Sequence, residues 1–468
     1  MKRRLLFLLV LLALLSGLTL AFSPAARAET RSVQISSSCI KANTYMKTGN
    51  IGGANYLFEV PSNWNGTLVL YSHGYVPVGS PLTPLDAGDT LTEGALLQQG
   101  YALAGSSYSQ NGWALQQAFH DQVALLDFFT TTCGPPTRTI AWGHSLGGII
   151  TAGLIQLNPD RFAGALPMCG VLAGGVGTWN QALDGAYAFN VLLARNALSI
   201  VHITDPTGAF NQAEAILASA QKTAQGRARI ALAAALSDTP GWFDPASPEP
   251  ASKGFTAQEQ NQFLWESQVD FAFAFFARAE LEARAGGNPS WNTGVNYRPQ
   301  LEHSIDHSEI EALYKQAGLS LDGDLKTLDA TPRIAADPGA VQYLSRYIIF
   351  NGDVNMPVLT MHTTGDGLVV NQDEQAYASV VRAAGNNPLL REIFVHRAGH
   401  CSFTPAETLT AFQTLIHRMD TGKWGDSTNP DLLNQEAAAL GSTFNPVPPA
   451  FLTFEPTAFL RPFDTRDR

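Results

Sequence analysis

A serine flanked by glycines carries the strongest chemical signal in the sequence. Ser145 lies in the pattern Gly143-His144-Ser145-Leu146-Gly147, between a short apolar segment, Thr139–Trp142, and a helical pattern, Leu146–Leu157. Small neighbours allow a sharp turn from strand to helix, because a Cβ at their positions would crowd the adjoining backbone. The positive end of the following helix also favours an oxyanion. Ser145 is therefore the candidate nucleophile.

A serine hydroxyl needs a base, and that base needs a carboxylate to orient it. Asp366 lies in a glycine-flanked loop after the apolar segment Met356–His362. His400 lies in a loop after the next apolar segment, Arg391–His396. If both segments are parallel strands, their carboxyl ends meet at the edge that carries the serine. We therefore expect Asp366 to be the acid and His400 to be the base.

Two other residues compete for these roles. Asp373 is an alternative acid, but it lies inside a predicted helix, Gln372–Ala384. His396 is an alternative base, but it still belongs to the strand pattern. Asp366 alone also has a simpler explanation, since aspartates often cap turns.

Acyl transfer also requires backbone N–H groups that point at the oxyanion. One is expected from Leu146, directly after the nucleophile. The other is expected from the loop His73-Gly74-Tyr75, which follows the apolar strand Thr67–Tyr71. Gly74 would let this backbone approach the site, and Tyr75 N–H is the expected second donor.

Aromatic residues are candidates for the substrate side. Tyr108 and Trp113 follow another predicted strand and are candidates to line the pocket, although packing explains them equally well. The middle of the chain holds further aromatics, most of which we expect to build its own core: Trp179, Phe189, Trp242, Trp265, Phe271, Phe273, Phe275 and Phe276. A roofed, largely apolar pocket fits a hydrophobic or aromatic small molecule.

His303 and His307 are four residues apart and would share one face of a helix, as metal ligands do. No known metal motif completes the pair, so a polar helix face is the better interpretation. We predict neither a metal nor a cofactor.

Strand and helix patterns alternate on both sides of these motifs. Such alternation indicates a mostly parallel sheet with helices on both faces. It stops between the sixth core strand and Met356, where the chain is helical and is expected to roof the site as a lid. Five parts are expected: a signal peptide, 1–28; the first part of an α/β core, 29–176; a helical lid insertion, 177–346; the second part of the core, 347–424; and a C-terminal tail, 425–468.

The N-terminus has the pattern of a secretory signal peptide. Three basic residues at positions 2–4 precede an apolar stretch, Leu5–Phe22, and a small-x-small site, Ala26-Arg27-Ala28. We expect cleavage before Glu29, a secreted or periplasmic protein, and no stable membrane insertion afterwards. The alternative is a retained membrane anchor, because the apolar stretch approaches spanning length.

The net charge of -11 excludes a general affinity for nucleic acid or anionic lipid. Four cysteines remain after the signal peptide: Cys39, Cys133, Cys169 and Cys401. In an exported protein this number indicates two disulfides, with three ways to pair them, whereas free buried thiols are the alternative.

The serine turn, the His73-Gly74 loop and the placement of Asp366 and His400 resemble the α/β-hydrolase superfamily, over residues 50–175 and 350–420. The resemblance implies the α/β-hydrolase fold, a Ser145–His400–Asp366 triad, and oxyanion donors from Tyr75 and Leu146. The segment Val60–Gly66 is similar to secreted bacterial esterases.

His400-Cys401 resembles the tannase and feruloyl esterase family, in which a cysteine after the catalytic histidine pairs with one before the serine. Here His144 precedes the serine instead. What the resemblance then implies is Cys401 paired with Cys169, and Cys39 paired with Cys133.

These patterns predict a secreted serine hydrolase that cleaves a small-molecule carboxylic ester through an acyl-enzyme on Ser145. A secreted peptidase or amidase with the same triad is the first alternative, and an acyltransferase is another. A non-catalytic binding protein on the same scaffold is the alternative from a different class. The sequence does not indicate an oligomeric state.

Overall fold

A nine-stranded sheet runs through residues 38–464, which are the residues that this computed structural model describes. They belong to one unit of the chain, 35–468; the other unit, 1–34, lies outside the described range. The strands are β1 (Tyr45–Ile51), β2 (Ala54–Val60), β3 (Thr67–Ser72), β4 (Ala102–Ser106), β5 (Arg138–His144), β6 (Gly164–Met168), β7 (Val358–Gly365), β8 (Leu390–Ala398) and β9 (Phe451–Leu452).

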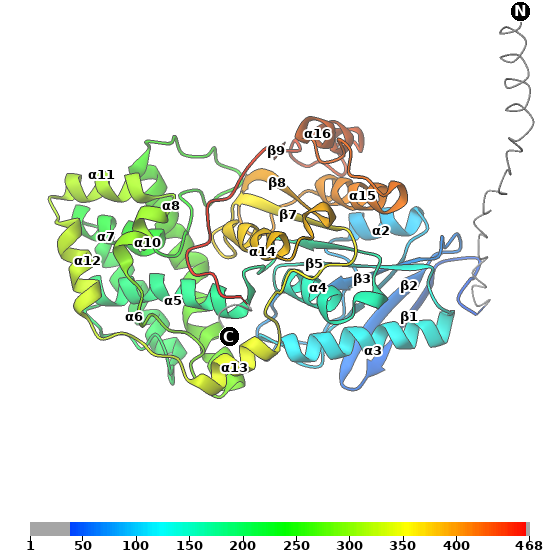
Figure 1. The fold of residues 1–468 in the computed structure, drawn as a ribbon, viewed down its shortest axis with the longest axis horizontal. Helices are drawn as coiled ribbons and strands as arrows, with labels where there is room; N and C mark the ends of the chain where they lie inside the picture. The colour runs from blue at the N-terminus through cyan, green and yellow to red at the C-terminus, as the bar shows by residue number, and fades with distance from the viewer. Residues whose placement is uncertain (1–37, 465–468) are drawn as a thin grey trace, which may run out of the picture. The chain divides into compact units, whose positions relative to one another are not determined.

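The strand order is β1-β2-β4-β3-β5-β6-β7-β8-β9. The six strands from β4 to β8 along this order run parallel, whereas β1, β2 and β9 pair antiparallel at the two edges. Parallel strands end at one edge of the sheet, so the loops after β3, β5, β7 and β8 meet there (Figure 1). The mostly parallel sheet with helices is the architecture expected from the sequence.

Helices cover both faces of the sheet because alternate side chains of each strand point to opposite sides. Leu68 and Leu70 of β3 belong to the core beneath α3, α4 and α14, whereas Val69 and Tyr71 belong to the core beneath α2 and α15. The helices that follow core strands are α2 (Thr90–Gln98), α3 (Leu115–Cys133), α4 (Leu146–Leu157), α14 (Gln372–Ala383) and α15 (Pro405–Thr421), and α16 (Pro430–Ala439) follows α15.

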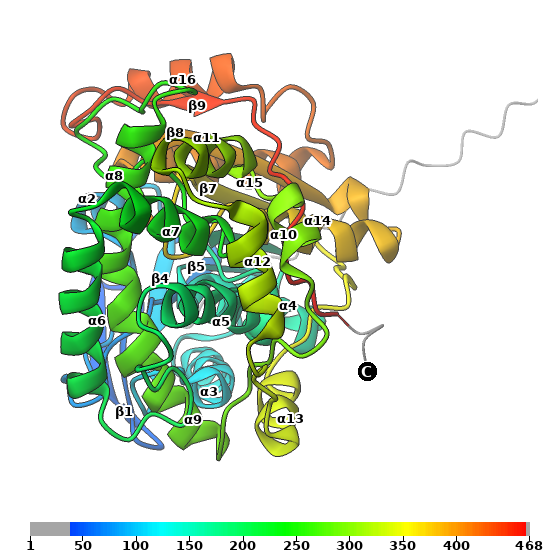
Figure 2. The same cartoon turned by 90° about the vertical axis from the view of Figure 1, so that its left-hand side faces the viewer.

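A helical insertion lies between β6 and β7, and it has its own apolar core (Figures 1 and 2). Two of its segments, η2 and η3, are π-helical, which is the wide turn often found at functional sites. Its segments are α5 (Gly174–Leu192), α6 (Pro206–Ala220), α7 (Ala224–Ala235), α8 (Phe255–Trp265), η2 (Glu266–Asp270), η3 (Phe273–Ala277), α9 (Arg278–Ala285), α10 (Tyr297–His303), α11 (His307–Ala317), α12 (Leu321–Ala330) and α13 (Pro338–Arg346).

Edge strand β1 and the tail elements α16 and β9 were not expected from the sequence. None of the β1 residues is fully buried, and four are exposed, including Met46, so the strand lacks an alternating apolar pattern. The tail pairs β9 with β8 and then crosses to the insertion, where Arg461 donates hydrogen bonds to Asp184 and to the Trp291 carbonyl. The tail therefore packs on both parts of the molecule.

Two disulfides join distant segments: Cys39–Cys133 and Cys169–Cys401. These are the two pairings that the resemblance implied. The first ties the start of the described chain to the end of α3. The second ties the residue after β6 to the residue after His400.

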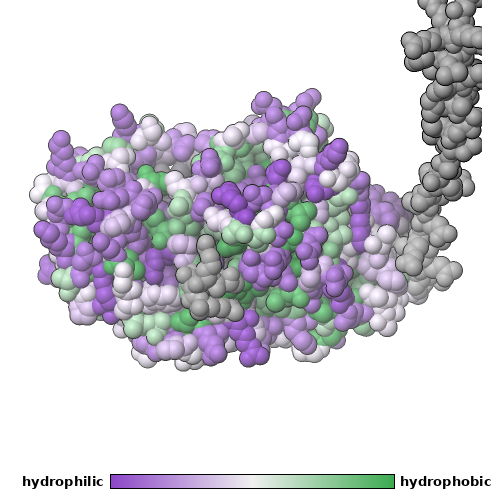
Figure 3. All heavy atoms as spheres, viewed as in Figure 1, coloured by the Kyte–Doolittle hydropathy of each residue, from purple (hydrophilic) through white to green (hydrophobic). Residues whose placement is uncertain are grey.

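The predicted signal peptide falls outside the described residues. Between residues 38 and 464, no helix has the length and apolar character needed to cross a membrane. The face of the molecule in Figure 3 is largely hydrophilic, with apolar side chains scattered between polar ones.

Candidate active site

Ser145 occupies the turn between β5 and α4 with a positive φ of 59°, a conformation that is strained for any residue except glycine. The neighbouring glycines make this turn possible. A Cβ on Gly143 would lie 2.5 Å from the Ser72 carbonyl oxygen, and one on Gly147 would lie 1.9 Å from it. The Ser145 N–H donates to the Met168 carbonyl at 3.0 Å, which fixes the turn to the end of β6.

Asp366 and His400 form a hydrogen-bonded pair at the ends of β7 and β8. His400 Nδ1 lies 2.7 Å from Asp366 Oδ2, and the carboxylate is fully buried. The other oxygen, Oδ1, accepts hydrogen bonds from the N–H groups of Leu368 and Val369. Two backbone donors and one imidazole therefore hold the carboxylate in the orientation that a catalytic acid needs.

A second buried histidine supports Asp366, and sequence reasoning missed it. Both ring nitrogens of His362 face acceptors, the Val369 carbonyl at 2.8 Å and Glu374 Oε1 at 2.9 Å, so the ring holds two protons. Burial opposes this charge, but Asp366 and Glu374 outweigh it and raise the pKa of His362 to about 10. The signal in the sequence is a histidine inside an apolar strand, four residues before the acid.

The charge on this histidine reaches the acid. His362 Nε2 lies 3.5 Å from Asp366 Oδ2. Burial by itself raises the pKa of Asp366, yet the neighbouring His400 and His362 lower it to about 2. Asp366 is therefore ionised at any ordinary pH.

The serine and the imidazole are held at the same edge of the sheet by the second disulfide. The Ser145 N–H donates a hydrogen bond to the Met168 carbonyl. Cys169, the next residue after Met168, forms a disulfide with Cys401, which is adjacent to His400 in the chain. Cys401 Sγ lies 3.4 Å from His400 Nε2. Within residues 38–464 the Ser145 hydroxyl has no hydrogen-bond partner, and catalytic hydrogen bonds often close only when substrate binds.

The loop after β3 lies against the serine, as expected for an oxyanion loop. A Cβ on Gly74 would be 3.4 Å from Ser145 Cβ, and Tyr75 and Leu146 line the same pocket as the serine. Tyr108 is 1% exposed and lies beneath this loop, not in the pocket wall. Its ring stacks on His73 at 4.1 Å and its hydroxyl donates to the His73 carbonyl. Tyr108 thus supports the loop backbone.

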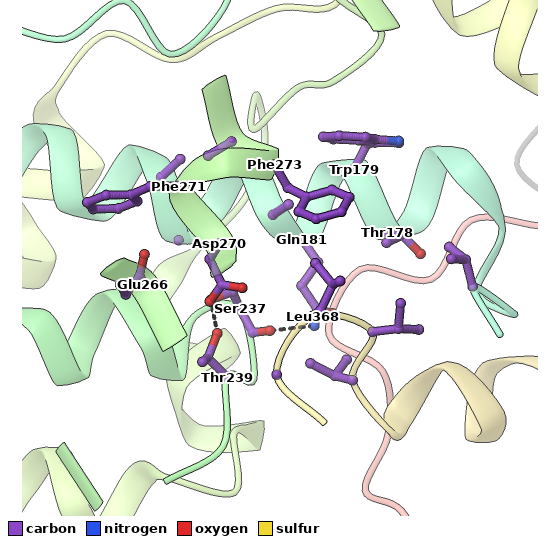
Figure 4. Close-up of a pocket in the computed structure, with 18 of the residues that line it drawn as sticks. Thr178, Trp179, Gln181, Ser237, Thr239, Glu266, Asp270, Phe271, Phe273 and Leu368 are labelled. Carbon is purple, nitrogen blue, oxygen red and sulfur yellow. Dashed lines mark hydrogen bonds between the residues drawn. The ribbon is translucent and has the colours of Figure 1, made fainter. Parts of the chain in front are cut away.

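Ser145 lines a pocket of about 1110 Å³, a volume that includes space open to solvent. Figure 4 shows residues of its wall. Trp113 lines it, as the sequence suggested, and packs edge-on against Trp179 of the insertion. Five of the insertion aromatics contribute to its wall: Trp179, Phe189, Phe271, Phe273 and Phe275. The pocket is thus built jointly by the core and the insertion, and most of its wall is apolar.

Three acids also line this pocket, the buried Glu266 and Asp373 and the half-buried Asp270, and sequence reasoning missed Glu266 and Asp270. Glu266 is 8% exposed and Asp270 Oδ2 has no hydrogen-bond partner in the structure. Burial raises the pKa of Glu266 to about 7, with Glu214 adding to the shift. Burial and the charges of Glu266 and Asp366 raise the pKa of Asp270 well above its ordinary range. Figure 4 shows both acids on the insertion segment that also carries Phe271 and Phe273.

The insertion packs directly on the loop after β7, which carries Asp366. A Cβ on Gly367 would lie 2.4 Å from the Trp265 ring, and one on Gly365 would lie 3.2 Å from Trp242. The Trp265 indole N–H donates to the Trp242 carbonyl at 3.0 Å. Trp265 directly precedes η2, so this contact fixes the π-helical turns above the catalytic groups.

The alternative acid and base occupy other positions. Asp373 lines the pocket, but its Oδ1 accepts hydrogen bonds from Ala173 N–H and the Thr178 hydroxyl, and it makes no hydrogen bond to His400. His396 is exposed and lies 3.5 Å from Glu249 at the surface.

His303 and His307 do not share a helix face. The first ends α10 and the second begins α11, because the chain turns between them. The predicted polar helix face is wrong at this point.

A serine on a strand-to-helix turn, followed in sequence by an acid and a histidine at two later strand ends, defines the class: this is an α/β-hydrolase. The chain is 30% identical over 424 residues to the o-phthalyl amidase of Xanthobacter agilis, and the match covers 83% of this chain and 89% of the relative. The chain therefore belongs to the same family of hydrolases as this amidase.

No family model matches the chain. Similar solved structures include an esterase from Aspergillus oryzae, at 13% identity and a TM-score of 0.41, covering 81% of this chain and 80% of that one. Feruloyl esterase B from the same organism is similar at 14% identity and a TM-score of 0.37, again covering 81% and 80%.

Proposed function

We propose that this hydrolase cleaves a carboxylic ester of a small aromatic or hydrophobic molecule, with Ser145 as nucleophile, His400 as base and Asp366 as acid. The observation that carries the proposal is the Asp366–His400 hydrogen bond at the sheet edge that also carries a strained serine, which lines a mostly apolar pocket. An ionised Asp366 keeps the proton on His400 Nδ1, so that Nε2 is free to accept the serine proton.

The proposed reaction has two halves. His400 Nε2 takes the proton of the Ser145 hydroxyl as its oxygen attacks the ester carbonyl, and the N–H groups of Leu146 and Tyr75 bind the resulting oxyanion. His400 then protonates the leaving alcohol, which leaves an acyl group on the serine. Water, deprotonated by the same imidazole, releases the acid and restores the enzyme.

The pocket wall limits the charge of the substrate. Glu266, Asp270 and Asp373 line it, whereas none of the described residues that line it is a lysine or an arginine. An anionic substrate would lie close to buried carboxyl groups with no compensating cation. We therefore propose that neutral or amine-bearing substrates are preferred over anionic ones.

Amide hydrolysis is the second candidate, and the similarity to an amidase favours it. The same groups can expel an amine, since His400 can protonate it as it leaves. The two candidates differ in the leaving group, which a matched pair of substrates distinguishes.

The first experiment is active-site labelling with a fluorophosphonate. We expect labelling of the wild type, none of Ser145→Ala, and full labelling of His396→Ala, which changes an exposed histidine. Absence of labelling in correctly folded wild type would favour the non-catalytic binding protein.

The second experiment compares a p-nitrophenyl ester with the p-nitroanilide of the same aromatic acid. We expect faster turnover of the ester, and a loss of about 10³-fold or more in kcat for Ser145→Ala on either substrate. Preference for the anilide in kcat/KM would make the protein an amidase.

We also propose that the protein is exported. Both disulfides of the described chain are of the kind that persists in oxidising compartments. Sequencing the N-terminus of the mature protein from the culture medium or periplasm tests this proposal, with Glu29 as the expected first residue.

A further inference from the structure

Three carboxylates converge between β2 and the start of α2. Glu59 comes from β2, Asp86 from the segment before α2, and Glu93 from the first turn of α2. One carboxylate oxygen from each lies within 4.8 Å of the other two. None of the three belongs to the pocket in front of Ser145.

The local backbone forces these groups together. A Cβ on Gly105 of β4 would lie 1.7 Å from the Leu85 carbonyl oxygen, so only glycine lets the 85–86 segment press against the sheet. β4 pairs with β2, which places Glu59 beside this segment. Asp89 caps α2 through Leu91 and Thr92 N–H and thereby fixes the turn that carries Glu93.

Two of the carboxylates are buried, and one oxygen of each lacks a hydrogen-bond partner, while Glu59 is hydrogen-bonded to Glu93. Glu59 is 4% exposed and Asp86 is 2% exposed. Glu59 Oε2 and Asp86 Oδ2 have no hydrogen-bond partner, and no salt bridge among residues 38–464 involves any of the three acids. Burial, and then the neighbouring carboxylates, raise the pKa of Glu59 and of Asp86 to about 7. Burying acids in this way costs free energy unless something neutralises them.

We propose that Glu59, Asp86 and Glu93 form a binding site for Ca²⁺. Oxygen ligands without histidine or cysteine select a hard divalent cation over zinc. Ca²⁺ binds its oxygens at about 2.3–2.6 Å, so ligands on opposite sides of one ion are about 5 Å apart. Mg²⁺ requires strict octahedral geometry and usually keeps several of its waters, whereas two of these three acids are buried. The bound ion would join β2 to α2.

The competing explanation is a proton shared between the carboxyl groups. It predicts that stability falls as pH rises through about 7, with no dependence on calcium, because the acids lose the protons that hold them together. A cation site predicts that Ca²⁺ removes this loss.

The experiment uses the full-length protein, freed of metal with a chelator and then titrated with CaCl₂ or MgCl₂ at pH 8. We expect one Ca²⁺ per chain by isothermal titration calorimetry, a rise in Tm that saturates with Ca²⁺, and at least tenfold weaker binding of Mg²⁺. Asp86→Asn and Glu59→Gln are expected to remove both signals. Glu392→Gln is the control, because it replaces a half-buried acid of β8 whose pKa is also raised.

The order of the melting temperatures of Asp86→Asn and the wild type is also expected to depend on Ca²⁺. Without Ca²⁺, Asp86→Asn should melt at the same temperature as the wild type or higher, because it removes a repulsive carboxylate. With Ca²⁺, the wild type should melt higher. A wild type with no saturable Ca²⁺ binding, or variants that keep the whole response, would overturn the proposal. Glu93→Gln, at a half-exposed position, serves the same purpose if a buried variant fails to fold.

Discussion

The two sides of the pocket in front of Ser145 are built in different ways. On the core side, each candidate catalytic group stands at the end of a parallel strand. Backbone hydrogen bonds fix Ser145 and Asp366, and Asp366 in turn holds His400. On the insertion side, the wall comes from α5 and from the π-helical turns, which follow Trp265, a residue packed on the loop that carries Asp366. The comparison suggests that the core sets the chemistry and the insertion sets the substrate.

The two sides also treat their acids in opposite ways. Asp366 of the core has hydrogen-bond donors and two nearby imidazoles, and its pKa is lowered to about 2. Glu266 and Asp270 of the insertion are desolvated and lie near other acids, Glu214 in the first case and Glu266 and Asp366 in the second, so their pKa values are raised. Asp366 therefore stays ionised, whereas Glu266 and Asp270 ionise more readily when a positively charged group lies in the pocket.

The largest expected effect lies on the core side. In His362→Gln the cation beside Asp366 is lost, so the pKa of Asp366 rises toward its ordinary value. We expect kcat to fall on the order of tenfold, and the loss of activity on acidification to begin at a higher pH than in the wild type. A pH profile of kcat measures both. His396→Gln, at the surface, should leave the profile in place, and an unchanged profile in His362→Gln would remove this role.

The next effect lies on the insertion side. In Asp270→Asn we expect the ratio of kcat/KM for an amine-bearing ester over a neutral one to fall about tenfold, with little change in kcat for the neutral ester. The p-nitrophenyl esters of phenylalanine and of 3-phenylpropanoic acid are a matched pair. Glu302→Gln, on α10, is the control. Equal losses on both esters would mean that Asp270 acts on the fold and not on selectivity.

The smallest effect concerns stability. Glu259 and Glu309 of the insertion have pKa values raised by burial to about 7 and about 9, above the ordinary 4.5. Raised acids stabilise the fold fully below pH 4.5, and this contribution is lost as pH rises toward 9. We expect hydrogen exchange in the insertion to accelerate between pH 6 and pH 9 beyond the intrinsic rate, while β5 and β7 stay protected.

Glu309→Gln tests this account, since it removes the group with the larger shift. It should reduce the pH dependence by on the order of 1 kcal/mol in the free energy of opening. If hydrogen exchange accelerated equally in the core and in the insertion, the pH dependence would belong to the whole fold, and the prediction would be wrong.

Local sequence patterns predicted where the candidate catalytic residues of the core lie. Ser145, Asp366 and His400 follow apolar strands, and glycines mark each turn, so their convergence is readable from the order of elements. The structure places all three at the same sheet edge and joins Asp366 to His400. Their catalytic roles remain the predictions that the labelling experiment tests.

The insertion side was not readable in the same way. Glu266 and Asp270 face the pocket because a π-helical turn replaces the 3.6-residue period on which sequence patterns depend. His362 was missed because its partner, Glu374, comes from the following helix, and only the folded chain brings the two together. Tyr108 follows a strand end as predicted, yet its side chain turns inward beneath the loop.

The C-terminal segment has a consequence for how the protein is made. Phe459 lines the pocket and Arg461 binds Asp184 of α5, so residues near the very end of the chain help to position an element that is synthesised some 280 residues earlier. The insertion can leave the ribosome long before it can settle into its final place. Loss of Phe459 and Arg461 is therefore expected to change the wall of the pocket that Ser145 lines.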